Sequence, residues 1–231
     1  MGRGASKSEG GALGSLSLGV KSIELSDGGT IDLSDTPLIY GNNDSAVSGN
    51  ARAAVEAWEN KRVKNKVEFN MSVDQNGNQI GDEVRGGKGS VRVPYYQLQD
   101  GAIHTHIHPR ENSRHLGGTF SDGDLKNFAD FGVSTYRAKA KEGAYSITKG
   151  SNFDVNGFKS FVAQLYNSER TKMENAGVAA RKRISTDSGY TYKQYSADFD
   201  KAFNGYLVAL HNGLRDGQKK YGYSYTLEGG K

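Results

Sequence analysis

The part of the sequence best suited to chemistry is residues 103–125, IHTHIHPRENSRHLGGTFSDGDL. Four of the five histidines of the chain fall in this stretch, and His104, His106 and His108 alternate with other residues. On a β-strand, alternation at period two places the three imidazoles on one face of the sheet. Imidazole nitrogen is a common ligand of divalent metal ions. The spacing therefore predicts a strand that presents metal ligands.

A possible partner for these histidines follows a few residues later. Ser121 and Asp124 form an S-x-x-D pattern in front of an apolar run that is typical of a helix start. A histidine strand and a helix start that carries a carboxylate can converge on one metal ion. The plainer interpretation is an ordinary N-cap, in which Ser121 and Asp124 only satisfy backbone amides and the histidines share hydrogen bonds.

Two histidines and an aspartate match a hydrolytic zinc site, which has three protein ligands and an open position for water. A carboxylate outside the ligand set can then move protons, and Glu68, on a predicted neighbouring strand, is the candidate. Glu83 and Glu56 are the alternatives if the strand register differs. Ser121 is placed to stabilise an oxyanion. Since cysteine is absent, any metal ligand must come from His, Asp or Glu.

Two choices of histidine pair are open. Pro109 directly after His108 favours His106 and His108 as ligands, whereas the extra histidine upstream allows His104 and His106. His115 fits a solvated loop better than a site. His211 lies in an apolar helical stripe without a partner motif, which predicts a structural role.

Composition limits the classes of partner. Lysine and arginine total 30 against 26 acidic residues, a net charge of +4, which is mild for 231 residues and argues against nucleic-acid binding. No apolar run reaches the roughly 20 residues of a membrane span, and no apolar segment follows the basic N-terminal residues. We therefore expect no membrane association, no secretory signal, and a location in the cytoplasm or a virion.

Three segments are expected along the chain. Residues 1–43 are a flexible, glycine-rich arm with short strands. Residues 44–150 form the core, with a helix over 44–63, a strand over 67–73 and another over 90–93, the histidine strand, a helix over 124–131, and a hairpin of strands 133–140 and 144–149.

Residues 151–231 are a helical extension, with helices over 158–184 and 197–216 forming a hairpin and a short strand at the end. The predicted fold class is α+β, with a mixed, curved sheet flanked by helices and a C-terminal helical hairpin.

The order of these motifs resembles a known family. A glutamate on an early strand, then H-x-H-P, then S-x-x-D at a helix start is similar to the JAB/JAMM (MPN-type) zinc metallopeptidases. The resemblance covers about residues 68–149. It implies that His106, His108 and Asp124 bind zinc, that Glu68 is the general acid and base, and that Ser121 assists at the oxyanion. The gap between His108 and Ser121 is longer than the usual family spacing.

More narrowly, the succession of VEFNMSVDQNGN, a glycine turn, HxHP, TFSDGDL and AYSITK resembles the JAB-like domain of phage minor head or head-morphogenesis proteins and of some polymorphic toxins. This resemblance implies a peptide or protein substrate. It also implies a second function, that of a phage structural or head-assembly protein, in which the domain is a docking module, with or without catalytic activity, for phage virion proteins or for further copies of this chain.

Overall fold

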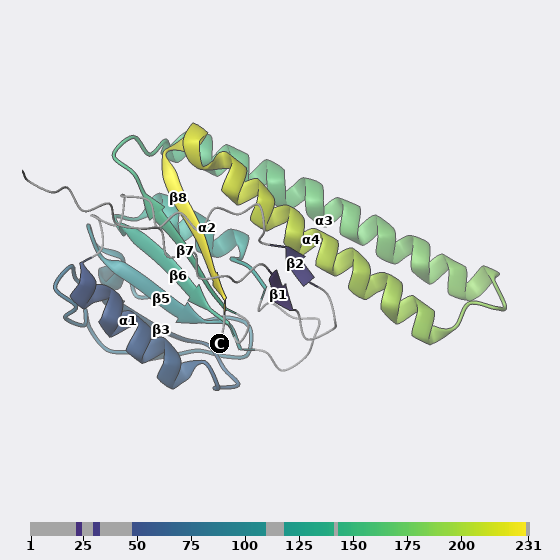
Figure 1. Cartoon of the computed structure of the whole chain (residues 1–231), viewed down its shortest axis with the longest axis horizontal. Helices are drawn as coiled ribbons and strands as arrows, with labels where there is room; N and C mark the ends of the chain where they lie inside the picture. Colours follow the sequence, from purple (N-terminus) through teal and green to yellow (C-terminus); the bar gives the residue numbers. More distant parts are fainter. Residues whose placement is uncertain (1–21, 25–29, 33–47, 110–117, 141–142, 230–231) are drawn as a thin grey trace, which may run out of the picture.

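The computed structural model describes residues 22–24, 30–32, 48–109, 118–140 and 143–229. Within them the fold is α+β, with helices on both sides of an open six-stranded sheet (Figure 1). In the predicted N-terminal arm, β1 (Ser22–Glu24) and β2 (Thr30–Asp32) pair antiparallel. The rest of the arm lies outside the described residues.

The large sheet is mixed, as predicted. Its strand order is β4-β3-β5-β6-β7-β8, and the β5–β6 pair is parallel while the other pairs are antiparallel. The last strand returns from the C-terminal segment and extends the sheet beside β7, which confirms the predicted terminal strand. The strands are β3 (Phe69–Val73), β4 (Val84–Arg85), β5 (Ile103–Ile107), β6 (Thr135–Lys139), β7 (Gly143–Lys149) and β8 (Tyr223–Gly229).

One face of the sheet is covered by α1 (Gly49–Arg62). Its Ala51 and Val55, one helical turn apart, pack against Met71 and Ile103 in a small apolar cluster. The helix begins later than predicted, because the side chain of Ser48 accepts the N–H of Ala51 at 3.2 Å and so provides the N-cap.

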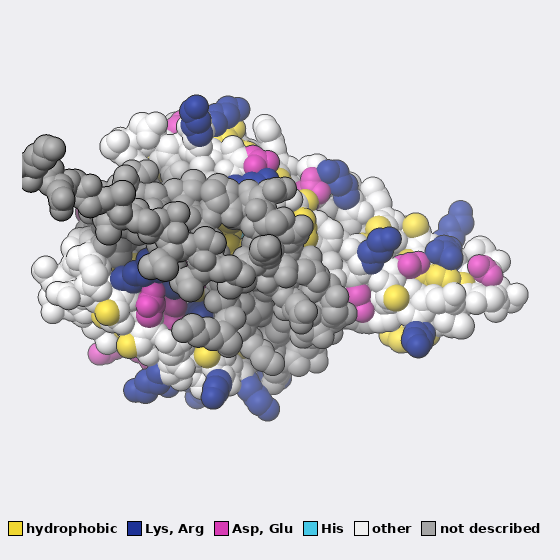
Figure 2. Space-filling view, in the orientation of Figure 1, with side chains coloured by type: hydrophobic (Ala, Val, Ile, Leu, Met, Phe, Trp, Pro, Cys, Tyr) yellow, Lys and Arg dark blue, Asp and Glu magenta, His cyan; other side chains and the backbone are white. Residues whose placement is uncertain are grey.

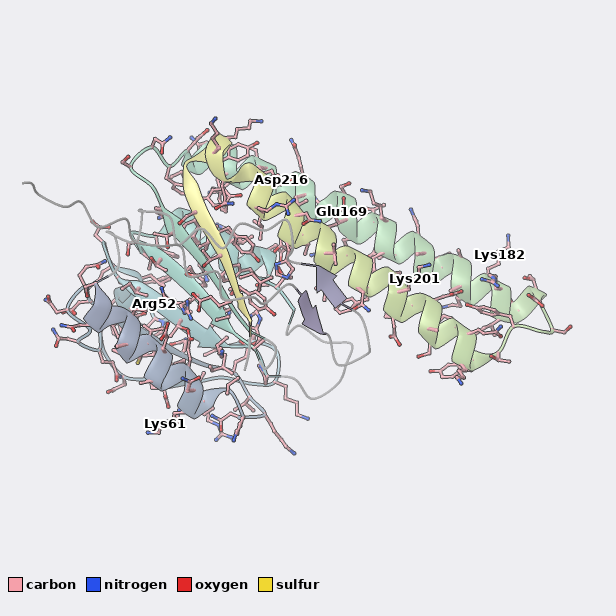
Figure 3. All side chains as sticks on the ribbon, viewed as in Figure 1. Arg52, Lys61, Glu169, Lys182, Lys201 and Asp216 are labelled. Atoms are coloured by element: carbon pink, nitrogen blue, oxygen red, sulfur yellow. The ribbon has the colours of Figure 1, made fainter. Side chains whose placement is uncertain are left out.

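The other face is covered by α2 (Asp122–Asp130) and by the hairpin of α3 (Val155–Thr186) and α4 (Tyr192–Tyr221). The predicted hairpin is confirmed, and both helices are longer than predicted. Its far part projects beyond the sheet, with Lys182 near the tip and Glu169 closer to the sheet (Figures 1 and 3). Although α3 and α4 are long, no helix in the described part of the chain is apolar enough to cross a bilayer.

The strand predicted over residues 90–93 was wrong. The edge of β3 is taken by β4, in which Val84 pairs with Asn70. The turn after β4 is closed by a hydrogen bond from the N–H of Gly87 to the carbonyl of Ser90, at 2.9 Å. Residues 91–93 therefore have no strand partner among the described residues, and Val91 and Val93 line a cavity instead.

Candidate metal centre

The histidine strand lies inside the sheet, between β3 and β6. Alternation along β5 sends His104 and His106 to the face that α2 covers. His108 follows the end of the strand but stays fixed in the sheet, because its N–H donates to the carbonyl of Lys139 at 2.8 Å. All three side chains are buried. The strand thus holds the imidazoles on a rigid backbone.

The start of α2 brings the carboxylate of Asp124 to the same place. Ser121 is the N-cap, and a reciprocal capping box links the two residues. The N–H and the hydroxyl of Ser121 donate to Oδ2 of Asp124 at 2.7 and 2.8 Å, and the N–H of Asp124 donates to Oγ of Ser121 at 3.1 Å. Since Oδ2 is held by the cap, Oδ1 has capacity for another ligand.

The three side chains meet at one point. Nε2 of His106 and Nε2 of His108 are 2.8 Å apart, and Oδ1 of Asp124 lies 3.4 Å from Nε2 of His106. Oδ2 of Asp124 lies 3.6 Å from Nε2 of His108. Burial alone would raise the pKa of Asp124, but the charge and hydrogen bonds of the two imidazoles outweigh it and hold this pKa well below its usual range.

This arrangement fits a divalent metal ion. Tetrahedral ligands about 2.0–2.1 Å from zinc lie roughly 3.3 Å apart, close to the separations in the triad. Without a cation, only one of the two facing Nε2 atoms can carry a hydrogen. A cation at this point would use both Nε2 lone pairs. His106, His108 and Asp124 could therefore hold one ion.

The donor set narrows the choice of metal. Two imidazole nitrogens and one carboxylate oxygen suit zinc in hydrolytic sites, and the same set holds iron(II) in 2-His-1-carboxylate centres. Thiolate-dependent sites are excluded, because the chain has no cysteine.

Glu68 lies beside this triad. It immediately precedes β3, and its backbone pairs with Gly86 and Gly87 on the segment that follows β4. Its side chain is buried and lines the same cavity as the triad. Burial raises the pKa of Glu68 to about 7; the charge of His108 opposes this shift, and the charge of Asp124 adds to it. A carboxyl group with this pKa can both take up and release a proton near neutral pH.

The two alternative glutamates lie in ion pairs elsewhere. Glu83 accepts hydrogen bonds from Trp58 and Arg62, and Glu56 pairs with Arg52. Neither carboxylate lines the cavity. Of the three glutamates considered from the sequence, the structure thus brings Glu68 alone to the triad.

His104 is the histidine that the triad does not use. It is fully buried, its Nδ1 hydrogen-bonds Oγ of Ser72 at 2.9 Å, and its ring lies 4.6 Å from that of Tyr136. Burial, together with the charge of His106, holds the pKa of His104 well below its usual value. The geometry therefore favours the pair His106 and His108 over the pair that includes His104. His115 lies outside the described residues.

The remaining histidine has a structural environment. Nδ1 of His211, on α4, hydrogen-bonds the hydroxyl of Tyr225, and its Nε2 hydrogen-bonds the carbonyl of Gly118. A neutral imidazole satisfies both contacts if Nε2 carries the hydrogen. This side chain agrees with the structural role expected from the sequence.

The triad and Glu68 open into a cavity of about 320 Å³. Its opposite wall comes from the C-terminal hairpin, which sequence reasoning treated as an extension apart from the site. That wall consists of Tyr166, Arg170, Phe203, Tyr206 and Leu207. The helical spacing of Phe203 and Leu207 was visible in the sequence, but an apolar stripe does not reveal which surface it meets.

Comparisons with protein-family models, with curated proteins and with solved structures found no match to this chain.

Proposed function

We propose that the protein is a zinc-dependent peptidase or isopeptidase of the JAB/JAMM type. One observation carries the proposal: Glu68, His106, His108 and Asp124 line one cavity. Their order along the chain, a glutamate, then H-x-H-P, then S-x-x-D, is the order in which that family uses its site residues. In this proposal the sheet around β5 and the helix α2 correspond to the JAB-like core.

His106, His108 and Asp124 are the proposed zinc ligands. When bound, zinc supplies Lewis-acid activation of water and of the scissile carbonyl. The strand and the capping box hold the ligands before the ion arrives, so little side-chain freedom is lost on binding. Ser121 orients the carboxylate of Asp124 through Oδ2, which is the kind of supporting hydrogen bond that tunes a metal ligand.

Glu68 is the proposed general base and acid. Its deprotonated carboxylate accepts a proton from the attacking water, and the carboxylic acid so formed donates that proton to the leaving amine. The raised pKa of Glu68 suits both steps near neutral pH. Ser121 is the proposed oxyanion donor; its hydroxyl hydrogen is bonded to Asp124 in the structure, so this role requires exchange of that bond for one to the substrate.

The experiment is metal analysis of protein purified without a histidine tag, followed by a hydrolysis assay. We expect one equivalent of zinc after loading, and less than a tenth of an equivalent for His106→Ala and Asp124→Ala. Peptide and isopeptide substrate libraries analysed by mass spectrometry should show cleavage that a chelator abolishes and zinc restores. Absence of zinc binding in the unmodified protein would remove the proposal.

A second candidate function is assembly, in which the domain docks on phage virion proteins or on further copies of this chain. The observation that favours it is the projecting hairpin, which exposes Val178, Ile184 and Tyr192 among mixed acidic and basic side chains (Figure 2). Light scattering after size-exclusion chromatography should then show a defined oligomer. A zinc-loaded monomer with hydrolytic activity would favour the peptidase alone.

A further inference from the structure

The hairpin wall of the cavity is fixed to the start of α2. The hydroxyl of Tyr166, on α3, donates to the carbonyl of Phe120 at 2.6 Å, directly before the cap residue Ser121. On α4, Leu207 lies so close to Gly118 that an added Cβ there would collide with it. The wall therefore has a set position relative to Asp124, and a side chain on it faces a defined part of the cavity.

Arg170 lies one helical turn after Tyr166 on this wall. Its Nη2 is 3.5 Å from Oδ2 of Asp122, a long contact between side chains that are 45% and 61% exposed. The charge of the guanidinium also opposes the rise in the pKa of Tyr206 that burial causes, so the two side chains lie near each other on this wall. A guanidinium has five N–H donors, so most of the N–H groups of Arg170 remain available for a ligand.

The charges around the cavity single out this residue. Among the described residues that line the cavity, Arg170 is the one lysine or arginine, whereas Glu68, Asp122 and Asp124 supply carboxylates. Phe203 and Leu207 add apolar surface to the same wall of the cavity. The planar fork of a guanidinium is well suited to bind a carboxylate through two parallel hydrogen bonds.

We propose that Arg170 binds a carboxylate group of the substrate and thereby sets specificity for peptides that present one at this wall. The word substrate rests on the proposed peptidase function, but the carboxylate site does not. The incoming carboxylate takes the place of Asp122, whose contact is long and exposed to solvent. The carboxylate has two sources in a peptide: an acidic side chain or the C-terminus.

Binding to metal-free protein tests the site without activity. The probes are N-acetyl-glutamate amide, N-acetyl-glutamine with a free C-terminus, and the neutral N-acetyl-glutamine amide, titrated by NMR in the presence of a chelator. We expect at least one carboxylate probe to bind roughly tenfold or more tightly than the neutral probe, as for a charge-assisted hydrogen bond. The preferred probe identifies the source of the carboxylate.

Variants assign the preference to one side chain. Arg170→Gln should bind the carboxylate and neutral probes equally, and Arg170→Lys should keep part of the preference because it keeps the charge but loses the fork. Asp122→Asn should bind the carboxylate probe more tightly, since the internal competitor is gone. Lys182→Gln, near the tip of the same hairpin (Figure 3), is the matched control and should behave as the unmodified protein.

Kinetics separate this proposal from the peptidase function. For an acidic substrate, Arg170→Gln should raise KM about tenfold with little change in kcat, and it should not affect a neutral substrate. Equal affinity of the unmodified protein for all three probes, or an unchanged preference in Arg170→Gln, would overturn the proposal even if zinc-dependent cleavage is found. A retained preference without any cleavage would instead remove the peptidase function and leave the carboxylate site.

Discussion

The buried polar side chains on the two faces of β5 differ in how completely they are hydrogen-bonded. Thr105 points to the face covered by α1, where its Oγ1 donates to Oε1 of Glu59 at 2.7 Å. Arg137, which pairs with Thr105 across the parallel strands, gives the same carboxylate two more hydrogen bonds at 2.8 and 3.1 Å. Arg137 also bonds Glu228 on β8. No side-chain atom of this network lacks a partner among the described residues.

On the opposite face, each of the three buried histidines of this segment has one unpaired ring nitrogen. Nδ1 of His106, Nδ1 of His108 and Nε2 of His104 have no hydrogen-bond partner among the described residues. Folded proteins pair almost all their buried polar atoms, because an unpaired one costs free energy. One face of β5 thus carries a closed ion network that stabilises the fold. The other carries two imidazoles whose facing Nε2 atoms could bind an ion, with Nδ1 atoms that stay unpaired with or without that ion.

The largest expected effect is on activity, from Glu68→Gln. This change keeps the size of the side chain but removes the base, so hydrolysis should fall by about 10²–10⁴-fold. Zinc content should stay at one equivalent, because Glu68 is not a proposed ligand. Glu83→Gln is the matched control, since Glu83 lies in an ion pair away from the cavity. If both variants lost activity equally, the assignment of Glu68 would be wrong.

The next effect is on stability, from Arg137→Met. Removing the arginine leaves Glu59 buried without its charge partner, so the free energy of unfolding should fall by about 3–5 kcal/mol in urea denaturation. The double change Glu59→Leu with Arg137→Met should recover part of this loss. Zinc affinity should not change in either variant. A loss of zinc affinity would show that the two faces are not independent.

Acid should weaken the fold through His211. Burial lowers its pKa from 6.5 to about 4, against the opposing hydrogen bond to Gly118. Because folding favours the neutral imidazole, this stabilisation is complete above pH 6.5 and is lost as the pH falls, by about 3 kcal/mol at pH 4. Denaturation of the unmodified protein and of His211→Gln between pH 7.5 and 4 checks this. Parallel pH curves for the two proteins would contradict it.

The smallest effect is expected from Ser121→Ala. Loss of the cap should cost about 1 kcal/mol of stability, and loss of the hydrogen bond to Asp124 should weaken zinc binding about 10–100-fold. Thr191→Ala is a matched control, because Thr191 forms the same kind of capping box with Gln194 at the start of α4. It should lose similar stability and no zinc affinity. Equal zinc affinity in both variants would show that Ser121 only caps the helix and does not support zinc binding.

The parts of the candidate site that short sequence patterns specify could be predicted from the sequence. Alternation at period two identifies the face of His106, and the S-x-x-D pattern identifies the helix start with Asp124. The choice between Glu68 and Glu83 was open, because it depends on Trp58 and Arg62, which lie about 20 residues or more from Glu83 and hold its carboxylate in the folded state.

The fold was predictable in class but not in its pairings. Hydrophobic spacing predicted the hairpin of α3 and α4, but nothing in the sequence placed Arg170 and Tyr206 opposite the histidines. Residues 90–93 have the composition of a strand, but β4 pairs with β3 at the sheet edge in their place. Such competition between segments is decided by tertiary contacts and not by local propensity.

The most direct test of the central claim is anomalous diffraction at the zinc edge from crystals of the zinc-loaded protein. The account predicts one peak, about 2.0–2.2 Å from Nε2 of His106, Nε2 of His108 and Oδ1 of Asp124. A crystal grown with excess zinc that shows no peak between these side chains, or a peak held by His104 in place of one of them, would contradict it.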